Sequence, residues 1–148
     1  MRFVRSGGGY VGIHSASDTE HGWPFYRGLV GAELRAHSTV QAATVVVEDR
    51  SSSSTRELPA RWARSDEWYA FTRDPRAQVH VLARIDEASY EPGTASMIDH
   101  PISWCHHYRG GRSWYSAMGH TAESYGEPRF RAHLLGGILW AAGLRGRC

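Results

Sequence analysis

The stretch over residues 6–19, SGGGYVGIHSASDT, constrains the fold more than any other part of the chain. Three glycines lead into a short apolar run at residues 10–13, and polar side chains follow that run at once. This pattern is typical of a buried strand that ends in a polar loop. In open α/β sheets, ligands bind at the carboxyl ends of the strands. We therefore expect His14 and Asp18 to project into a crevice.

The rest of the chain alternates between strand and helix patterns. We expect, in order, a helix from Pro24 to near His37, strands at 40–48, 67–71 and 78–86, a hairpin at 103–118 and a helix at 128–144. The last helix has the clearest apolar stripe, and Gly136-Gly137 within it predict close packing on the sheet. This order fits one α/β domain over residues 1–148. Residues 1–6 followed by glycines resemble the last turn of a helix, which predicts that an N-terminal part of the fold is missing.

The composition of the chain limits which partners the protein can bind and in which compartment it is expected. The arginines are scattered among acidic residues and the net charge is only +2, so we expect no nucleic-acid partner. The sequence shows neither a signal peptide nor an apolar run of membrane-spanning length, which predicts a soluble cytoplasmic protein without a membrane partner. Two cysteines cannot build a disulfide framework, so reduced thiols are expected, with Cys105 in the core and Cys148 at the end.

Polar residues gather where the predicted strands end, and each group could face one crevice: His14 with Asp18, His37, Asp99 with His100, and His120 with Glu123. Imidazoles and carboxylates brought together in this way can hold a divalent metal such as zinc. His14, His100 and His120 are the preferred ligands. No local metal motif is present, so the alternative stays open that these histidines cap loops or bind the backbone.

General acid–base chemistry is the other use of such residues, because histidine titrates near neutral pH and a carboxylate can orient it. His120 and Glu123, in the segment GHTAE, form the best local pair for a catalytic role, together with His14. Glu123 could equally point away and never meet His120. A tryptophan beside the first loop suits the apolar face of a sugar. The candidate substrate-binding residues are Ser15, Asp18, Trp23, His37 and Asp99.

Several sequence blocks together carry a family resemblance: GGGYVGIHSASD, WPFYRGLVGAEL, ATVVVEDRSS, RSDEWYAF, DHPISWCHHYRGGRSWYSAMGHTAESY and HLLGGILWAAG. In this combination and order the chain resembles the trehalose-utilisation (ThuA-like) family. The resemblance implies a flavodoxin-like three-layer α/β/α sandwich of the class I glutamine amidotransferase-like superfamily. Family members carry further N-terminal strands before the glycine run, so the resemblance also implies that this domain lacks them. The missing strands would leave an exposed sheet edge.

The resemblance also bears on chemistry. Catalytic amidotransferases place a cysteine in the turn after the equivalent strand, and here His14 stands in that turn, so no thioester can form and glutamine hydrolysis is not expected. His120 and Glu123 resemble the later histidine–glutamate pair, with one extra residue between them. The family implies the catabolism of a small-molecule sugar substrate, which is trehalose, a related disaccharide or a keto-sugar. The oligomeric state stays open, with a homo-oligomer as one alternative. Two alternatives stay open: a non-catalytic carbohydrate-binding or regulatory domain, and a fragment that does not act alone.

Overall fold

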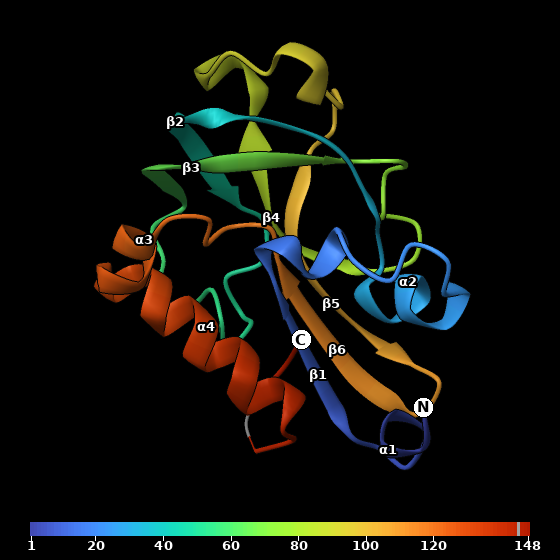
Figure 1. The fold of residues 1–148 in the computed structure, drawn as a ribbon. Helices are drawn as coiled ribbons and strands as arrows, with labels where there is room; N and C mark the ends of the chain where they lie inside the picture. The colour runs from blue at the N-terminus through green and yellow to red at the C-terminus, as the bar shows by residue number, and fades with distance from the viewer. Residues whose placement is uncertain (145) are drawn as a thin grey trace.

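Six strands pair in the order β1-β6-β5-β4-β2-β3 (Figure 1). The computed structural model describes residues 1–144 and 146–148. Within these residues β1 and β6 pair in parallel, and the other four neighbouring pairs are antiparallel. The strands are β1 (Gly9–Ile13), β2 (Leu34–Val47), β3 (Arg61–Phe71), β4 (His80–Asp86), β5 (Pro101–Tyr108) and β6 (Gly111–Ser116). The predicted mixed α/β fold is therefore confirmed.

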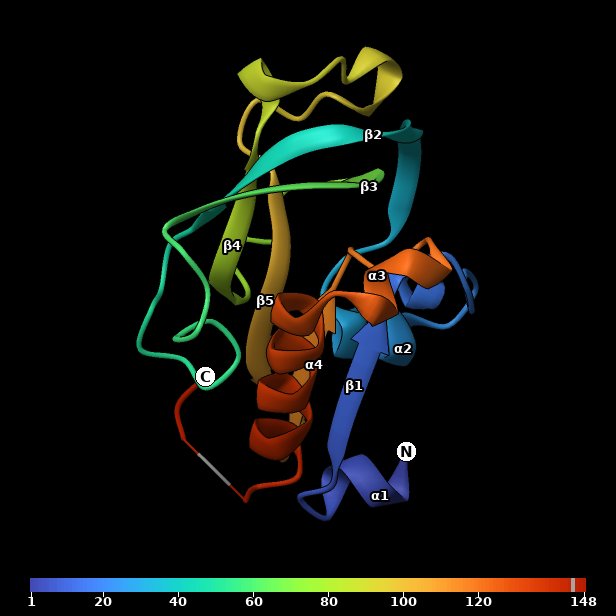
Figure 2. The same ribbon diagram turned by 90° about the vertical axis from the view of Figure 1, so that its left-hand side faces the viewer.

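Helices lie on both faces of β1 and β6, as Figure 2 shows for α4 and α2. Successive strand residues point to opposite faces, and β6 uses this alternation: Trp114 packs toward α4, while the Ser113 hydroxyl donates to the carbonyl of Leu29 in α2. No helix in the described part of the chain has both the length and the apolar character needed to cross a bilayer. The helices are α1 (Arg2–Arg5), α2 (Pro24–Val30), α3 (Ala122–Gly126) and α4 (Pro128–Ala141), with the 3₁₀ turns η1 (His14–Ser17), η2 (Glu87–Ser89) and η3 (Gly93–Ala95).

Helix α4 lies close against the chain beneath it, as its two glycines predict. A Cβ atom at Gly136 would lie 2.2 Å from the carbonyl oxygen of Ser53, and one at Gly137 would lie 2.4 Å from the Trp114 ring. Neither distance is compatible with a real carbon atom. The prediction of close packing is therefore confirmed, and it explains why two helix-disfavouring residues stand in the middle of this helix.

The sheet curls strongly, and the curl matters for the site. Strand β2 is long, and its register with β3 shifts between Leu34 and Ala36 and again between His37 and Val40. Such irregularities bend a strand and increase its twist. As a result β2 and β3 run across the other strands at the top of the molecule (Figures 1 and 2). The edge strand β3 thereby approaches the carboxyl end of the opposite edge strand, β1.

Three predicted elements differ from the structure by several residues at one end: the helix from Pro24, the strand at 40–48 and the strand at 67–71. The helix expected to reach His37 ends at Val30, because Gly31 takes a left-handed conformation with φ of 100° and stops it. Extended backbone then begins at Leu34. Strand β3 begins at Arg61 rather than at Glu67, and its first six residues alternate between exposed and buried side chains as a half-buried strand does. At the start of the chain, the predicted helix turn is confirmed by α1.

The cysteine prediction was wrong. The sulfur atoms of Cys105 in β5 and Cys148 are joined in a disulfide, with Cα atoms 5.7 Å apart. The two residues are 43 positions apart, so their meeting depends on how the chain folds back after α4, which no local pattern reveals. The expectation that Cys105 lies in the core is confirmed, since its side chain is fully buried.

Candidate functional site

His14 stands directly after β1, on the first residue of η1, with a positive φ of 46°. Few non-glycine residues adopt this conformation, and such strain often marks functional sites. Two contacts hold it: the Tyr115 hydroxyl donates to the His14 carbonyl at 2.8 Å, and His14 Nδ1 lies 2.7 Å from the carbonyl oxygen of Ala117. A carbonyl oxygen only accepts, so Nδ1 carries the hydrogen. His14 Nε2 is therefore the ring nitrogen that contacts other side chains of the site.

His120 reaches the same point from β6. Because β1 and β6 are parallel, their carboxyl ends meet at one edge, and the loop after β6 turns there at Gly119 with φ of 109°. His120 Nδ1 lies 3.1 Å from His14 Nε2. The His14 side chain is 9% exposed and that of His120 is 44% exposed. One imidazole is thus buried and the other opens to solvent.

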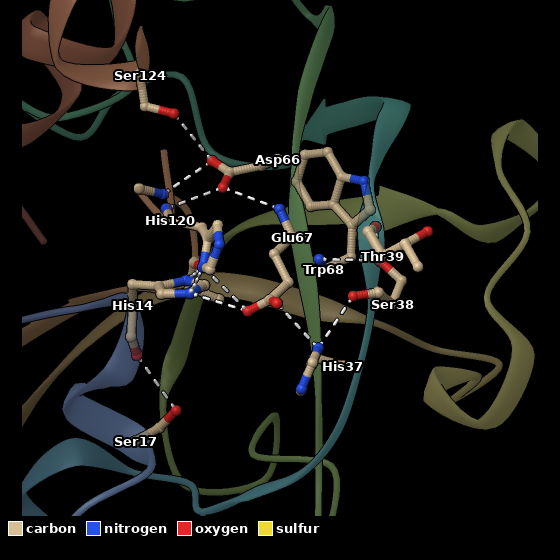
Figure 3. Close-up of polar contacts among 12 residues, drawn as sticks. His14, Ser17, His37, Ser38, Thr39, Asp66, Glu67, Trp68, His120 and Ser124 are labelled. Carbon is tan, nitrogen blue, oxygen red and sulfur yellow. Dashed lines mark hydrogen bonds and ion pairs between the residues drawn. The ribbon is translucent and has the colours of Figure 1, made fainter. Parts of the chain in front are cut away.

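Glu67 supplies the third group, from the middle of β3. Its Oε2 atom lies 3.2 Å from His14 Nε2 and 3.3 Å from His120 Nδ1 (Figure 3). We call these three side chains the His14–Glu67–His120 cluster. The three facing atoms, one from each side chain, could together hold a metal ion. The cluster exists because the curled sheet carries β3 across to the end of β1.

Two further side chains border the cluster. His37, from β2, places Nδ1 3.0 Å from Glu67 Oε1, so one carboxylate faces three imidazoles. The Tyr69 ring lies against the His14 ring with centroids 4.0 Å apart. Burial, together with the nearby Glu67 carboxylate, raises the pKa of Tyr69 to about 12. Tyr69 therefore stays a neutral phenol at physiological pH and adds no charge beside the cluster.

A buried ion pair supports the cluster from behind. The fully buried Asp66 carboxylate accepts the backbone N–H groups of Glu67 at 3.0 Å, Gly119 at 2.8 Å and His120 at 3.0 Å. Arg64 Nη2 lies 3.0 Å from Asp66 Oδ2. Asp66 thus connects the backbone of two cluster residues, from β3 and from the loop after β6. Desolvation lowers the pKa of Arg64, whose side chain is only 3% exposed.

The structure separates several predicted site residues from the cluster. His100 is fully buried, with Nδ1 2.7 Å from Glu87 Oε1 and Nε2 2.8 Å from the Tyr69 carbonyl oxygen. Both ring nitrogens are therefore engaged in the core, and Glu67 takes the place that the sequence interpretation gave to His100. Asp99 forms ion-pair contacts with Arg76 at 2.5 and 2.9 Å.

Glu123 does not pair with His120. It is exposed in the first turn of α3 and lines a separate groove of about 440 Å³ with Thr121 and Glu127. The geometry of α3 explains why the predicted pair does not form. The Thr121 side chain caps the helix by accepting the Ser124 N–H, and the first turn that this cap fixes directs Glu123 outward. The carboxylate beside His120 comes from Glu67 instead.

The remaining predicted substrate contacts lie near the end of β1. Ser15 is exposed on η1, and Asp18 follows that turn with its carboxylate 3.4 Å from the exposed His21. Trp23 is 38% exposed, and its ring stacks on Phe25 and Tyr26 with centroids 5.9 and 6.0 Å apart. An exposed, supported indole of this kind can receive the apolar face of a ring.

Glu67 and Asp66 were missed by sequence reasoning, although one signal was available. The segment RSDEWYAF places two adjacent acidic residues within a run of strand-forming residues. Adjacent strand residues face opposite sides, so one of the two had to be buried and needed a partner. That partner is Arg64, two residues earlier and on the same side of β3.

The trehalose-utilisation family pattern, ThuA, matches residues 1–141. The chain belongs to this family. A ThuA-like protein from Bacteroides uniformis ATCC 8492 superimposes with a TM-score of 0.79 at 26% identity, over 95% of this chain and 60% of that one. A second, from Parabacteroides merdae ATCC 43184, gives 0.79 at 18% identity, over 99% and 64%. The chain thus spans less than two thirds of these ThuA-like proteins.

The fold also occurs within a larger enzyme. A β-galactosidase from Bacillus circulans sp. alkalophilus matches with a TM-score of 0.62 at 16% identity, over 98% of this chain and 20% of that chain. At this identity the likeness concerns the fold alone. No curated protein sequence matches the chain.

Proposed function

We propose that this ThuA-family protein is an enzyme of sugar catabolism that acts on trehalose, a related disaccharide or a keto derivative by acid–base chemistry. One observation carries the proposal: a single carboxylate, Glu67, lies within 3.3 Å of His14, His37 and His120 at the carboxyl end of β1 and β6. Histidine and glutamate are the usual groups that transfer protons in such reactions. The family to which the chain belongs supports the substrate class.

The positions of the side chains suggest a division of roles. His120 is the solvent-facing imidazole, so it is placed to exchange a proton with a substrate hydroxyl or with the carbon beside a keto group. Glu67 orients it and balances the charge that it gains. His14 is held on a strained turn after a strand, the kind of turn on which hydrolases present a reactive side chain. Trp23 is the candidate surface for the sugar ring.

Turnover by matched variants tests this proposal. The purified chain would be incubated with trehalose and with its keto derivative, and products would be followed by mass spectrometry. Removing a general acid–base group typically costs about 10²–10⁴ in rate, so Glu67→Gln and His120→Ala should each lose at least about 100-fold. His80→Ala is the control, because His80 also pairs with a carboxylate, Asp49 at 2.8 Å, elsewhere on the surface.

The residue at position 14 supports a second candidate function, that of a non-catalytic carbohydrate-binding or regulatory domain. The resemblance to catalytic amidotransferases implies that His14 stands in the turn where they carry cysteine, which supports a domain that has kept binding and lost catalysis. A non-catalytic carbohydrate-binding or regulatory domain would bind the same sugars saturably, and Trp23→Ala would weaken that binding without any product forming. Product formed by the wild-type chain rules this alternative out, as it rules out a fragment that does not act alone.

Other features stay predictions. A flavodoxin-like sandwich is supported by helices on both faces and by the greater length of the ThuA-like structures, but the described sheet has one parallel pair. It likewise stays a prediction that the protein binds neither nucleic acid nor membranes, and that it forms a homo-oligomer. The Cys105–Cys148 disulfide weighs against the predicted cytoplasmic location, because disulfides persist mainly in oxidising compartments.

A further inference from the structure

The geometry points to a mononuclear zinc site formed by His14 Nε2, Glu67 Oε2 and His120 Nδ1. The inference rests on the proposed function in that it names the cofactor of the same cluster. Zinc in catalytic sites is commonly held by three such protein ligands, with a fourth position open. The three atoms come from β1, β3 and the loop after β6, and they face one another (Figure 3).

The distances between the ligand atoms fit such an ion. The three separations are 3.1, 3.2 and 3.3 Å. With metal–ligand bonds of about 2.0–2.1 Å, a tetrahedral ion separates its ligands by about 3.3 Å. The three observed separations all lie within about 0.2 Å of that value.

The hydrogen bond of His14 Nδ1 supplies a further argument. Since Nδ1 donates to the Ala117 carbonyl, the neutral ring presents a lone pair at Nε2. That lone pair faces the Glu67 carboxylate oxygen at 3.2 Å, which is also an acceptor. Two acceptor atoms at this distance repel each other unless a proton or a metal ion lies between them. A metal ion satisfies both atoms and His120 Nδ1 at once.

Two of the three ligands, His14 and Glu67, also have the outer contact that metal ligands usually have. Metal-binding histidines donate the second ring N–H to a carbonyl or carboxylate, and ligating carboxylates are themselves hydrogen-bonded. His14 donates to Ala117, as described. The second Glu67 oxygen, Oε1, lies 3.0 Å from His37 Nδ1, which also faces the Ser38 carbonyl and therefore carries its hydrogen. Asp66 fixes the His120 backbone. These contacts leave the three inward atoms free for a metal.

Zinc binding to the metal-free protein tests the inference without any substrate. The untagged chain would be stripped with chelator, titrated with zinc chloride by calorimetry and assayed for bound zinc by mass spectrometry. We expect one zinc per chain and a melting temperature that rises with zinc. Glu67→Gln should weaken affinity by at least about 100-fold and His37→Ala, which removes an outer contact, by about 10–100-fold. His80→Gln, with its own carboxylate partner, should match the wild type.

A Co²⁺-substituted sample gives a second readout, because tetrahedral cobalt has intense visible bands that should be missing in Glu67→Gln. If Glu67→Gln does not fold, His120→Asn takes its place, since His120 is the more exposed ligand. A wild-type chain that binds no zinc, or a folded Glu67→Gln or His120→Asn variant that binds it as tightly, overturns the inference. The two proposals fail separately: zinc binding without turnover contradicts only the enzyme, and turnover by a chain that binds no zinc contradicts only the metal site.

Discussion

Replacing Asp66 by asparagine should destabilise the domain severely, although the two side chains have the same shape. The carboxylate is fully buried, accepts three backbone N–H groups and pairs with Arg64. The amide has only one acceptor oxygen and presents its NH₂ group to a donor. It also leaves the buried Arg64 guanidinium with the more distant and more exposed Glu127 carboxylate, at 3.7 Å, as its remaining anion. Breaking a buried pair in this way costs about 3–5 kcal/mol.

Urea denaturation followed by circular dichroism measures this loss. At an m-value of about 2 kcal/mol/M, a loss of about 4 kcal/mol lowers the midpoint by about 2 M. Asp86→Asn is the control, because Asp86 pairs at 2.7 Å with an Arg61 side chain that is 59% exposed. Such a surface pair contributes at most about 1 kcal/mol.

A double-mutant cycle then separates the ion pair from the backbone contacts. Arg64→Met removes the buried cation, so the double variant Arg64→Met/Asp66→Asn should lose about 0.5–3 kcal/mol less stability than the two single variants summed. An Asp66→Asn loss no larger than that of Asp86→Asn would refute the reasoning. Strict additivity of the two changes would refute the claim that the carboxylate and the guanidinium depend on each other.

Three further predictions concern the scaffold. Burial lowers the pKa of His133 to about 4, so between pH 6.5 and 4 the unfolded chain binds more protons than the folded chain, and stability falls as the pH drops. The difference in free energy of unfolding between wild type and His133→Gln, measured by urea denaturation, should therefore shrink by about 3 kcal/mol between pH 7 and pH 4. A difference that stays constant over this range would contradict the prediction. Gly136→Ala should lower stability by about 1–3 kcal/mol through the Ser53 contact, despite a better helix propensity; a stabilised variant would contradict the close packing. For a 43-residue separation, loss of chain entropy in the unfolded state lets the Cys105–Cys148 disulfide stabilise the fold by at most about 4 kcal/mol. Cys148→Ser and dithiol-treated wild type should therefore unfold at the same lowered urea midpoint. A midpoint that does not shift on reduction would argue against the bond.

Features that depend on local sequence were predictable. The run at residues 10–13 followed by polar residues predicts a strand and the loop that presents His14, since both depend on neighbouring residues only. The same holds for β4, for the β5–β6 hairpin and for the glycines of α4. The parallel pairing of β1 and β6 then explains why His14 and His120, though distant in sequence, meet at one edge.

The third member of the cluster could not be predicted in this way. Glu67 lies in the middle of β3, where strand periodicity indicates only which side it faces. Its approach to His14 depends on the register shifts in β2 that bend the sheet, and no short motif encodes that bend. His100 and Glu123 were chosen because they lie near predicted strand ends, but the core contacts of His100 and the outward turn of α3 decide their actual positions.

The most direct test of the central claim is hydrogen exchange on a keto-disaccharide in D₂O. Acid–base chemistry in the His14–Glu67–His120 cluster predicts that the wild-type chain incorporates deuterium at the carbon beside the keto group, as measured by mass spectrometry. Glu67→Gln should slow the incorporation by at least about 100-fold while His80→Gln leaves it unchanged. A wild-type rate no higher than that of the solution without protein, or equal rates in wild type and Glu67→Gln, would contradict the account.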